Sequence, residues 1–182
     1  MKIHVAVNIK SEKILSLNIT YEHVHDSKVL PKLVGDIVKS KNITVVGKII
    51  ADGAYDSIVV FVCLADNRIL PCIKVRKNAR VGLKKGNIFR NLSAISQRKN
   101  DLQKWKDSSI SYGKRWIAET VFSSIKRTFK EYVYSVKFKN MIQEMMIKAS
   151  LYNKIISIQI IRVRRLWMLR IIQQSILICN SC

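Results

Sequence analysis

The chain has 182 residues, of which 33 are Lys or Arg and 12 are Asp or Glu, so its formal net charge is +21. Hydrophobic residues make up 48% of the sequence, which suits one globular core and excludes a multi-span membrane protein. A surface this basic predicts a polyanionic partner, although the charge alone does not distinguish DNA from RNA.

Alternating apolar residues predict a β-hairpin at the start of the chain. The segments KIHVAVNI (2–9) and KILSLNIT (13–20) each alternate, and in the second we expect Leu15, Leu17 and Ile19 to point inward. The next segment, HDSKVLPKLVGDIVKSK, changes to helical spacing. Asp26 or Ser27 is suited to cap the N-terminus of that helix.

The run VVGKIIADGAY (45–55) predicts a central strand that ends at Asp52. A helix over residues 58–67 and a strand at ILPCIKV follow. Residues 74–106 are then basic and poor in apolar residues. We expect nucleic-acid contacts there, from Lys84, Lys85 and Arg90. The alternative is an ordinary solvated loop.

The segment SYGKRWIAETVFSSIKRTF (111–129) predicts a helix with a single carboxylate among several cations. On that helix one stripe holds four polar residues, Tyr112, Arg115, Glu119 and Lys126. A lone acid beside cations suits a divalent metal ion held next to nucleic-acid phosphates. The alternatives are an Arg115–Glu119 ion pair on a solvated helix, and for Asp52 an ordinary turn residue.

The order of these elements favours an α/β fold. A hairpin, a helix, a strand ending in Asp52, and a late helix carrying Glu119 match the ribonuclease-H-like layout, a mixed sheet flanked by helices. In that layout, carboxylates from two strands and one helix hold two divalent metal ions for phosphoryl transfer.

The sequence resembles the DDE transposases of prokaryotic insertion sequences, in the group of families 4 and 5. The stripe reproduces their Y-x2-R-x3-E-x6-K pattern, ADGAYDS resembles their second-aspartate block, and the likeness covers Met1–Asn153. The resemblance implies that Asp52 and Glu119 are catalytic and hold Mg²⁺ or Mn²⁺. It also implies DNA contacts from the remaining members of the stripe, Tyr112, Arg115 and Lys126.

One departure from the family pattern concerns its first aspartate. That residue lies on a strand before this hairpin, so we expect a partial catalytic domain (1–153) that lacks its first strand and the preceding helix-turn-helix region. Asp26 is the nearest substitute, but at a helix N-terminus it is not expected to be a ligand. With two of three carboxylates, metal binding should be weak and the chain inactive alone. The exposed hairpin edge should favour homo-oligomers, or mixed oligomers with an intact transposase, on transposon ends and target DNA.

Residues 154–182 form a basic, amphipathic C-terminal tail. Its four arginines, Arg162, Arg164, Arg165 and Arg170, argue against a membrane-spanning helix, and we expect packing on the domain rather than membrane binding. A lone CNSC motif lacks the second ligand pair of a zinc site. With no signal peptide in MKIHVAVNIKSEK, we expect a cytoplasmic, nucleoid-associated protein. The alternative functions are a non-catalytic DNA-binding remnant and a basic RNA-associated protein.

Overall fold

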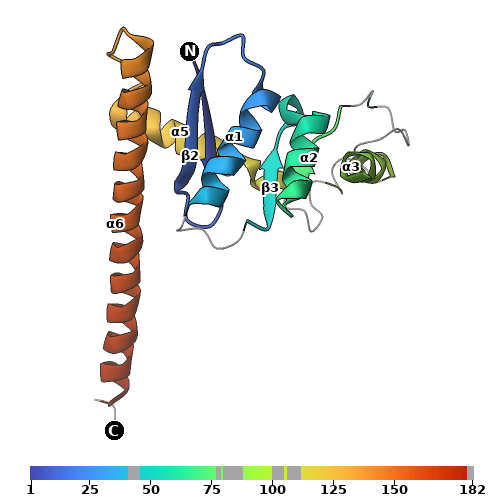
Figure 1. Ribbon diagram of the computed structural model, residues 1–182. Coiled ribbons are helices and arrows are strands. Elements are labelled where there is room, and N and C mark those ends of the chain that lie inside the picture. Colours follow the sequence, from blue (N-terminus) through green and yellow to red (C-terminus); the bar gives the residue numbers. More distant parts are fainter. Residues whose placement is uncertain (41–45, 77–78, 80–87, 100–104, 106–111, 180–182) are drawn as a thin grey trace.

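The computed structural model describes residues 1–182 except 41–45, 77–78, 80–87, 100–104, 106–111 and 180–182 (Figure 1). The fold is mixed α/β. In chain order its elements are β1 (Lys2–Val7), β2 (Ile14–Thr20), α1 (Asp26–Lys39), β3 (Lys48–Ala51), the 3₁₀ turn η1 (Gly53–Tyr55), α2 (Ile58–Asp66), β4 (Leu70–Ile73), α3 (Ile88–Lys99), the 3₁₀ turn η2 (Tyr112–Arg115), α5 (Trp116–Phe129) and α6 (Phe138–Cys179).

The predicted hairpin is confirmed, with β1 and β2 antiparallel and Val5 opposite Leu17. The pairing shifts between Ala6 and Val7, so that Val7 lies opposite Ile14. This bulge gives β2 one extra residue, Leu15. Ile14, which the alternation did not place inward, takes a core position and packs with Val121 and Ile125 of α5, while Leu15 is half-buried.

The second unit is a parallel pair in which β3 and β4 are joined through α2, with Ile50 opposite Cys72. The most deeply buried side chains of its core come from α2 and β4 and include Val60, Phe61, Leu64 and Ile73. Leu30 and Val34 of α1 close this core from one side. The cap of α1 is neither Asp26 nor Ser27: His25 Nδ1 accepts a hydrogen bond from the Ser27 N–H at 3.4 Å.

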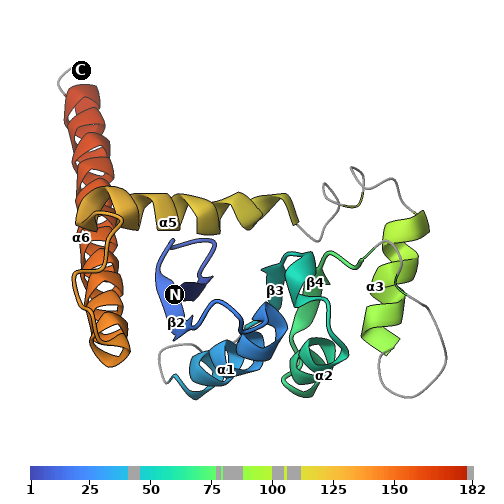
Figure 2. The same cartoon turned by 90° about the horizontal axis from the view of Figure 1, so that it is seen from above.

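Within the described residues the strands form two separate two-stranded sheets, β1–β2 and β3–β4. The helix α1 packs on the hairpin and also contributes to the core of the parallel unit. On one face α1 contacts β1, β2 and η1, while on the other α5 contacts β1 and η2 contacts β3. Figure 2 shows the hairpin between α1 and α5. Because α6 packs on β2, β1 is the hairpin strand on the side of β3.

Part of the basic region 74–106 is not a loop. It contains α3, whose Gln97 side chain is buried against the end of β4. Gln97 Oε1 accepts from the Val75 N–H at 2.9 Å, and its Nε2 donates to the Ile73 carbonyl at 2.9 Å. These two bonds fix the helix beside β4.

The C-terminal region is one helix of 42 residues, α6, which runs past the predicted boundary at 153/154 and away from the rest of the fold (Figure 1). Asn153 docks it on the hairpin: its Oδ1 accepts from the Ile14 N–H and its Nδ2 donates to the Ile14 carbonyl, both at 2.8 Å. No helix in the described part of the chain has the length and apolar character needed to cross a membrane.

Candidate active site

Asp52 directly follows Ala51, the last residue of β3, so it lies at the edge of the sheet where this strand ends. Its Oδ1 accepts a hydrogen bond from the Ala54 N–H at 2.9 Å and caps η1. Next to it, Gly53 lies close to the chain that leaves β4. A Cβ at this position would lie 3.3 Å from the Lys74 carbonyl oxygen, so glycine allows the two strand ends to approach.

Arg115 links the two predicted carboxylates, which come from distant parts of the sequence. Its Nη2 lies 2.9 Å from Glu119 Oε1, and its Nη1 lies 3.8 Å from Asp52 Oδ2. Glu119 stands in the first turn of α5, where the helix dipole favours a negative charge. The Arg115–Glu119 ion pair, which the sequence offered as the alternative to a metal ligand, is therefore present, and the same guanidinium also reaches Asp52.

A hollow of ≈ 460 Å³ opens beside Asp52. Three cationic residues line it, Lys74, Arg76 and Arg115. Sequence reasoning counted Lys74 and Arg76 only as part of a long basic stretch. The missed signal was their position directly after β4, because the ends of neighbouring parallel strands meet at one edge of a sheet.

Tyr112 also lines this hollow. Its side chain is buried and packs on Trp105, with ring centroids 4.9 Å apart. Burial raises the pKa of the Tyr112 phenol, and the nearby Arg115 opposes this shift. Tyr112 lies in the 3₁₀ turn η2 rather than in α5, so the predicted helical stripe begins one turn later than the spacing suggested.

Among the described residues, two other predicted DNA-binding residues, Lys126 and Arg90, do not line this hollow. Lys126 Nζ lies 2.5 Å from Glu131 Oε1 at the far end of α5. Arg90 makes two bonds to the buried carboxylate of Asp56, Nε–Oδ1 at 2.6 Å and Nη2–Oδ2 at 3.0 Å. Lys84 and Lys85 lie outside the described residues.

Asp26 lies at the start of α1 and faces β1. It forms an ion pair with Lys2, and its Oδ1 is 3.9 Å from His4 Nδ1. Burial raises the pKa of Tyr55 to about 12, and the charges of Asp26 and Asp52 add to this shift. Tyr55 therefore stands within the electrostatic reach of both carboxylates.

The carboxylates of Asp52 and Glu119 are the hard oxygen donors that Mg²⁺ and Mn²⁺ prefer. Both side chains are accessible to water, and one guanidinium already joins them. The donor chemistry therefore fits a divalent ion with two protein ligands. The described residues contain no group of three acidic, His or Cys side chains able to hold a metal.

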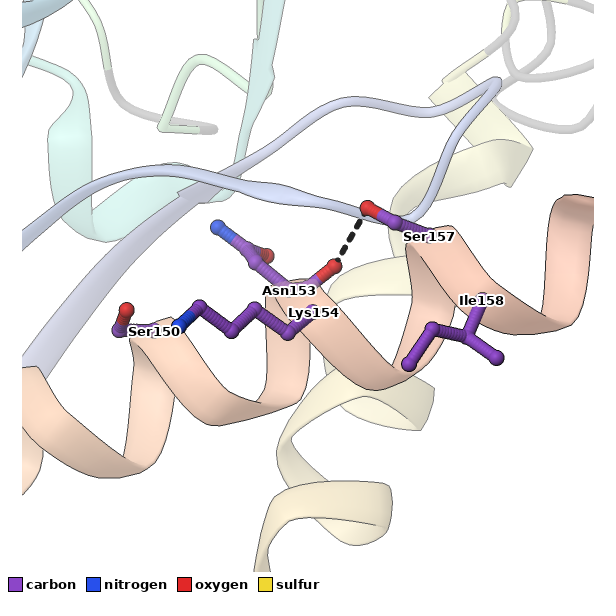
Figure 3. A pocket seen from close by; sticks show the side chains of 5 residues that line it. All are labelled: Ser150, Asn153, Lys154, Ser157 and Ile158. Atoms are coloured by element: carbon purple, nitrogen blue, oxygen red, sulfur yellow. Dashed lines mark hydrogen bonds between the residues drawn. The ribbon is translucent and has the colours of Figure 1, made fainter.

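A larger hollow of ≈ 540 Å³ lies along α6 (Figure 3). It is lined by Ser150, Asn153, Lys154, Ser157 and Ile158, and the Ser157 hydroxyl donates to the Asn153 carbonyl at 2.8 Å. With no carboxylate and one cation in its lining, it offers less chemistry than the hollow beside Asp52.

The profile of one protein family, described as Transposase DDE domain, matches residues 1–154. The chain belongs to this family of DDE transposases. No curated protein and no solved structure gives a significant match. Transposases act on DNA, and DDE domains generally use divalent metal ions, which points to a nuclease function in transposition. The family thus favours a transposase over a general basic RNA-associated protein.

Proposed function

We propose that this chain is the C-terminal part of the catalytic domain of an insertion-sequence DDE transposase, in the group of families 4 and 5. The observation that carries the proposal is the link through Arg115 between Asp52 and Glu119. The complete protein would bind transposon ends and target DNA, cut the DNA and join the strands. The nucleoid is where such a protein would work.

The proposed fold is a ribonuclease-H-like sheet that lacks its first strand. Two features support it. In the described residues β1 and β3 belong to separate sheets, and α1 packs on the hairpin and on the core of the parallel unit, while η2 contacts β3 and the adjoining α5 contacts β1. A strand between β1 and β3, running parallel to β3, would end beside Asp52. An aspartate on that strand would complete the set of three carboxylates.

In the proposed site, Asp52 and Glu119 hold Mg²⁺ or Mn²⁺. The metal ion, when bound, stabilises the negative charge that develops on the phosphoryl oxygens. Arg115, Lys74 and Arg76 bind DNA phosphates, and Tyr112 keeps η2 in place through its packing on Trp105. Two carboxylates leave the metal weakly bound, so we expect no strand transfer by this chain alone.

The proposed partners besides DNA are a second copy or an intact transposase. The edge of β1 that faces β3 makes no ladder hydrogen bonds within the described residues, and such an edge can accept a strand from another chain. Mixed oligomers formed in this way would bring the chain to the same transposon ends.

The test is restoration of the catalytic domain. A segment that supplies a strand with an aspartate is fused before Met1, and strand cleavage is assayed on a matching transposon end with Mg²⁺. Cleavage should appear and then fall by a factor of about 10² or more in D52N and E119Q, because each loses a group that stabilises the transition state. D66N, which removes an exposed carboxylate on α2, should cleave normally. Cleavage by E119Q at the rate of D66N would show that Glu119 is only a surface ion-pair partner.

A further inference from the structure

The two carboxylates proposed as metal ligands are both in contact with one positive group. Arg115 reaches Glu119 with Nη2 and Asp52 with Nη1, at 2.9 and 3.8 Å. The three side chains are 43–63% exposed, so water reaches the whole arrangement. Ion pairs this exposed are weak and exchange readily.

A divalent cation between Asp52 and Glu119 would compete with this guanidinium for the same oxygens. It would also repel the guanidinium directly, since both are positive. We propose that Arg115 is an exchangeable counter-ion: it neutralises the two carboxylates in the metal-free protein and leaves them when a divalent cation binds. This inference rests on the proposed function, which makes Asp52 and Glu119 the metal ligands.

The hollow beside Asp52 gives the released guanidinium a second partner. Arg115 lines this hollow together with Lys74 and Arg76. A guanidinium that no longer contacts carboxylates can donate two parallel hydrogen bonds to a phosphate, which a carboxylate-bound one cannot do with the same N–H groups. Metal binding therefore prepares the hollow for a phosphate of the DNA backbone.

The exchange couples two ligands through one side chain. If the metal raises the affinity for DNA by releasing Arg115, DNA raises the affinity for the metal by the same factor. Part of any such coupling comes simply from neutralising Asp52 and Glu119, and this part does not need Arg115. The variant that removes the guanidinium therefore separates the two contributions.

The first measurement is Mn²⁺ affinity of the full chain, followed by water-proton relaxation. R115Q should bind Mn²⁺ roughly fivefold more tightly than the wild type, as expected for loss of competing exposed ion pairs. R115K, which keeps the positive charge, should bind Mn²⁺ with an affinity within about twofold of the wild type. K114Q is the matched control, because it removes the same charge from the preceding residue of η2 and should leave the affinity unchanged.

The second measurement is binding of a short DNA duplex with and without Mn²⁺. Mn²⁺ should strengthen DNA binding more in the wild type and K114Q than in R115Q. Equal Mn²⁺ affinity in R115Q and K114Q would overturn the exchange, provided that D52N and E119Q still weaken Mn²⁺ binding. If D52N and E119Q bind Mn²⁺ like the wild type, the proposed metal ligands are wrong, and the exchange fails with them.

Discussion

Arg90 on α3 makes two hydrogen bonds, of 2.6 and 3.0 Å, to Asp56, which lies between η1 and α2, and the Asp56 side chain is fully buried. The same carboxylate accepts a third bond from the Arg76 N–H at 3.0 Å. Asp56 thus connects the junction between η1 and α2 to α3 and to the chain that leaves β4. The hydrogen bonds to Asp56, together with its negative charge, raise the pKa of the Arg90 guanidinium above its ordinary value.

The first prediction concerns this ion pair. R90Q should lower the free energy of unfolding by about 3 kcal/mol, because removing one partner leaves a buried charge uncompensated. Urea unfolding followed by circular dichroism measures the change. R98Q, on the last turn of the same helix, removes an equal charge from a more exposed residue and serves as the comparison. A destabilisation in R90Q no larger than in R98Q would mean that the ion pair with Asp56 contributes little.

Salt dependence of DNA binding gives the second prediction. Lys84 and Lys85 were predicted to bind phosphates, so the K84Q/K85Q double variant should flatten the log–log salt slope by about 0.9 for each phosphate that is no longer neutralised. Fluorescence anisotropy with a labelled duplex at several salt concentrations measures the slope. K10Q/K13Q, in the turn of the hairpin, removes the same charge and should change the slope less. Equal slopes for the two double variants would argue against specific phosphate binding by Lys84 and Lys85.

The third prediction tests the close approach at Gly53. G53A places a Cβ 3.3 Å from the Lys74 carbonyl oxygen, so either η1 or the end of β4 must shift. We expect a decrease of roughly 1 kcal/mol in the free energy of unfolding, as for mild overpacking. In G113A the added Cβ meets no atom within 4 Å, so little steric cost is expected. Thermal unfolding of both variants should separate them. Equal stabilities would show that the strand ends tolerate a side chain.

The fourth prediction concerns pH and Glu144 of α6. Its carboxylate pairs with Lys148 and also accepts hydrogen bonds from the Ser135 and Tyr134 N–H groups, and these interactions lower its pKa from 4.5 to about 2. A carboxylate with a lowered pKa stabilises the folded state above its unfolded pKa. This stabilisation should disappear as the pH falls from about 4.5 towards about 2.

Urea midpoints for the wild type and E144Q across this pH window provide the measurement. The wild type should be the more stable protein at about pH 6, and the difference should shrink as the pH falls to about 2. D66N, which also removes one negative charge, controls for the change in net charge. A difference between wild type and E144Q that stays constant with pH would contradict the hydrogen bonds and ion pair assigned to Glu144.

Local patterns predicted the hairpin, α1, α2 and the strands around them, because each of these elements follows a period of two or a helical repeat. The helix α3 was not predicted because polar residues occupy its buried side and apolar residues occupy its exposed side. Its inner face is held by Arg90 and Gln97, while Ile88 and Leu92 are exposed, so no apolar stripe marked the buried side. The β-bulge at Leu15 was not predicted because it depends on the pairing with β1 rather than on the sequence of β2.

The site was predictable in part. Glu119 and Arg115 are neighbours on any helix at their spacing, and the family resemblance indicated their association with Asp52. Lys74 and Arg76 required one more fact, that β4 lies directly beside β3 with the same direction. No local pattern contains this fact, because strand pairing is set by tertiary packing.

The bond between Asn153 and Ile14 joins residues that are 139 positions apart in the chain. During synthesis the hairpin leaves the ribosome long before the helix that covers it exists. At translation rates of about 5–20 residues per second, this delay is on the order of ten seconds. Throughout that time the apolar residues of β2 that later meet α5 and α6 are open to other nascent chains. The hairpin is therefore where a chaperone would be expected to bind first.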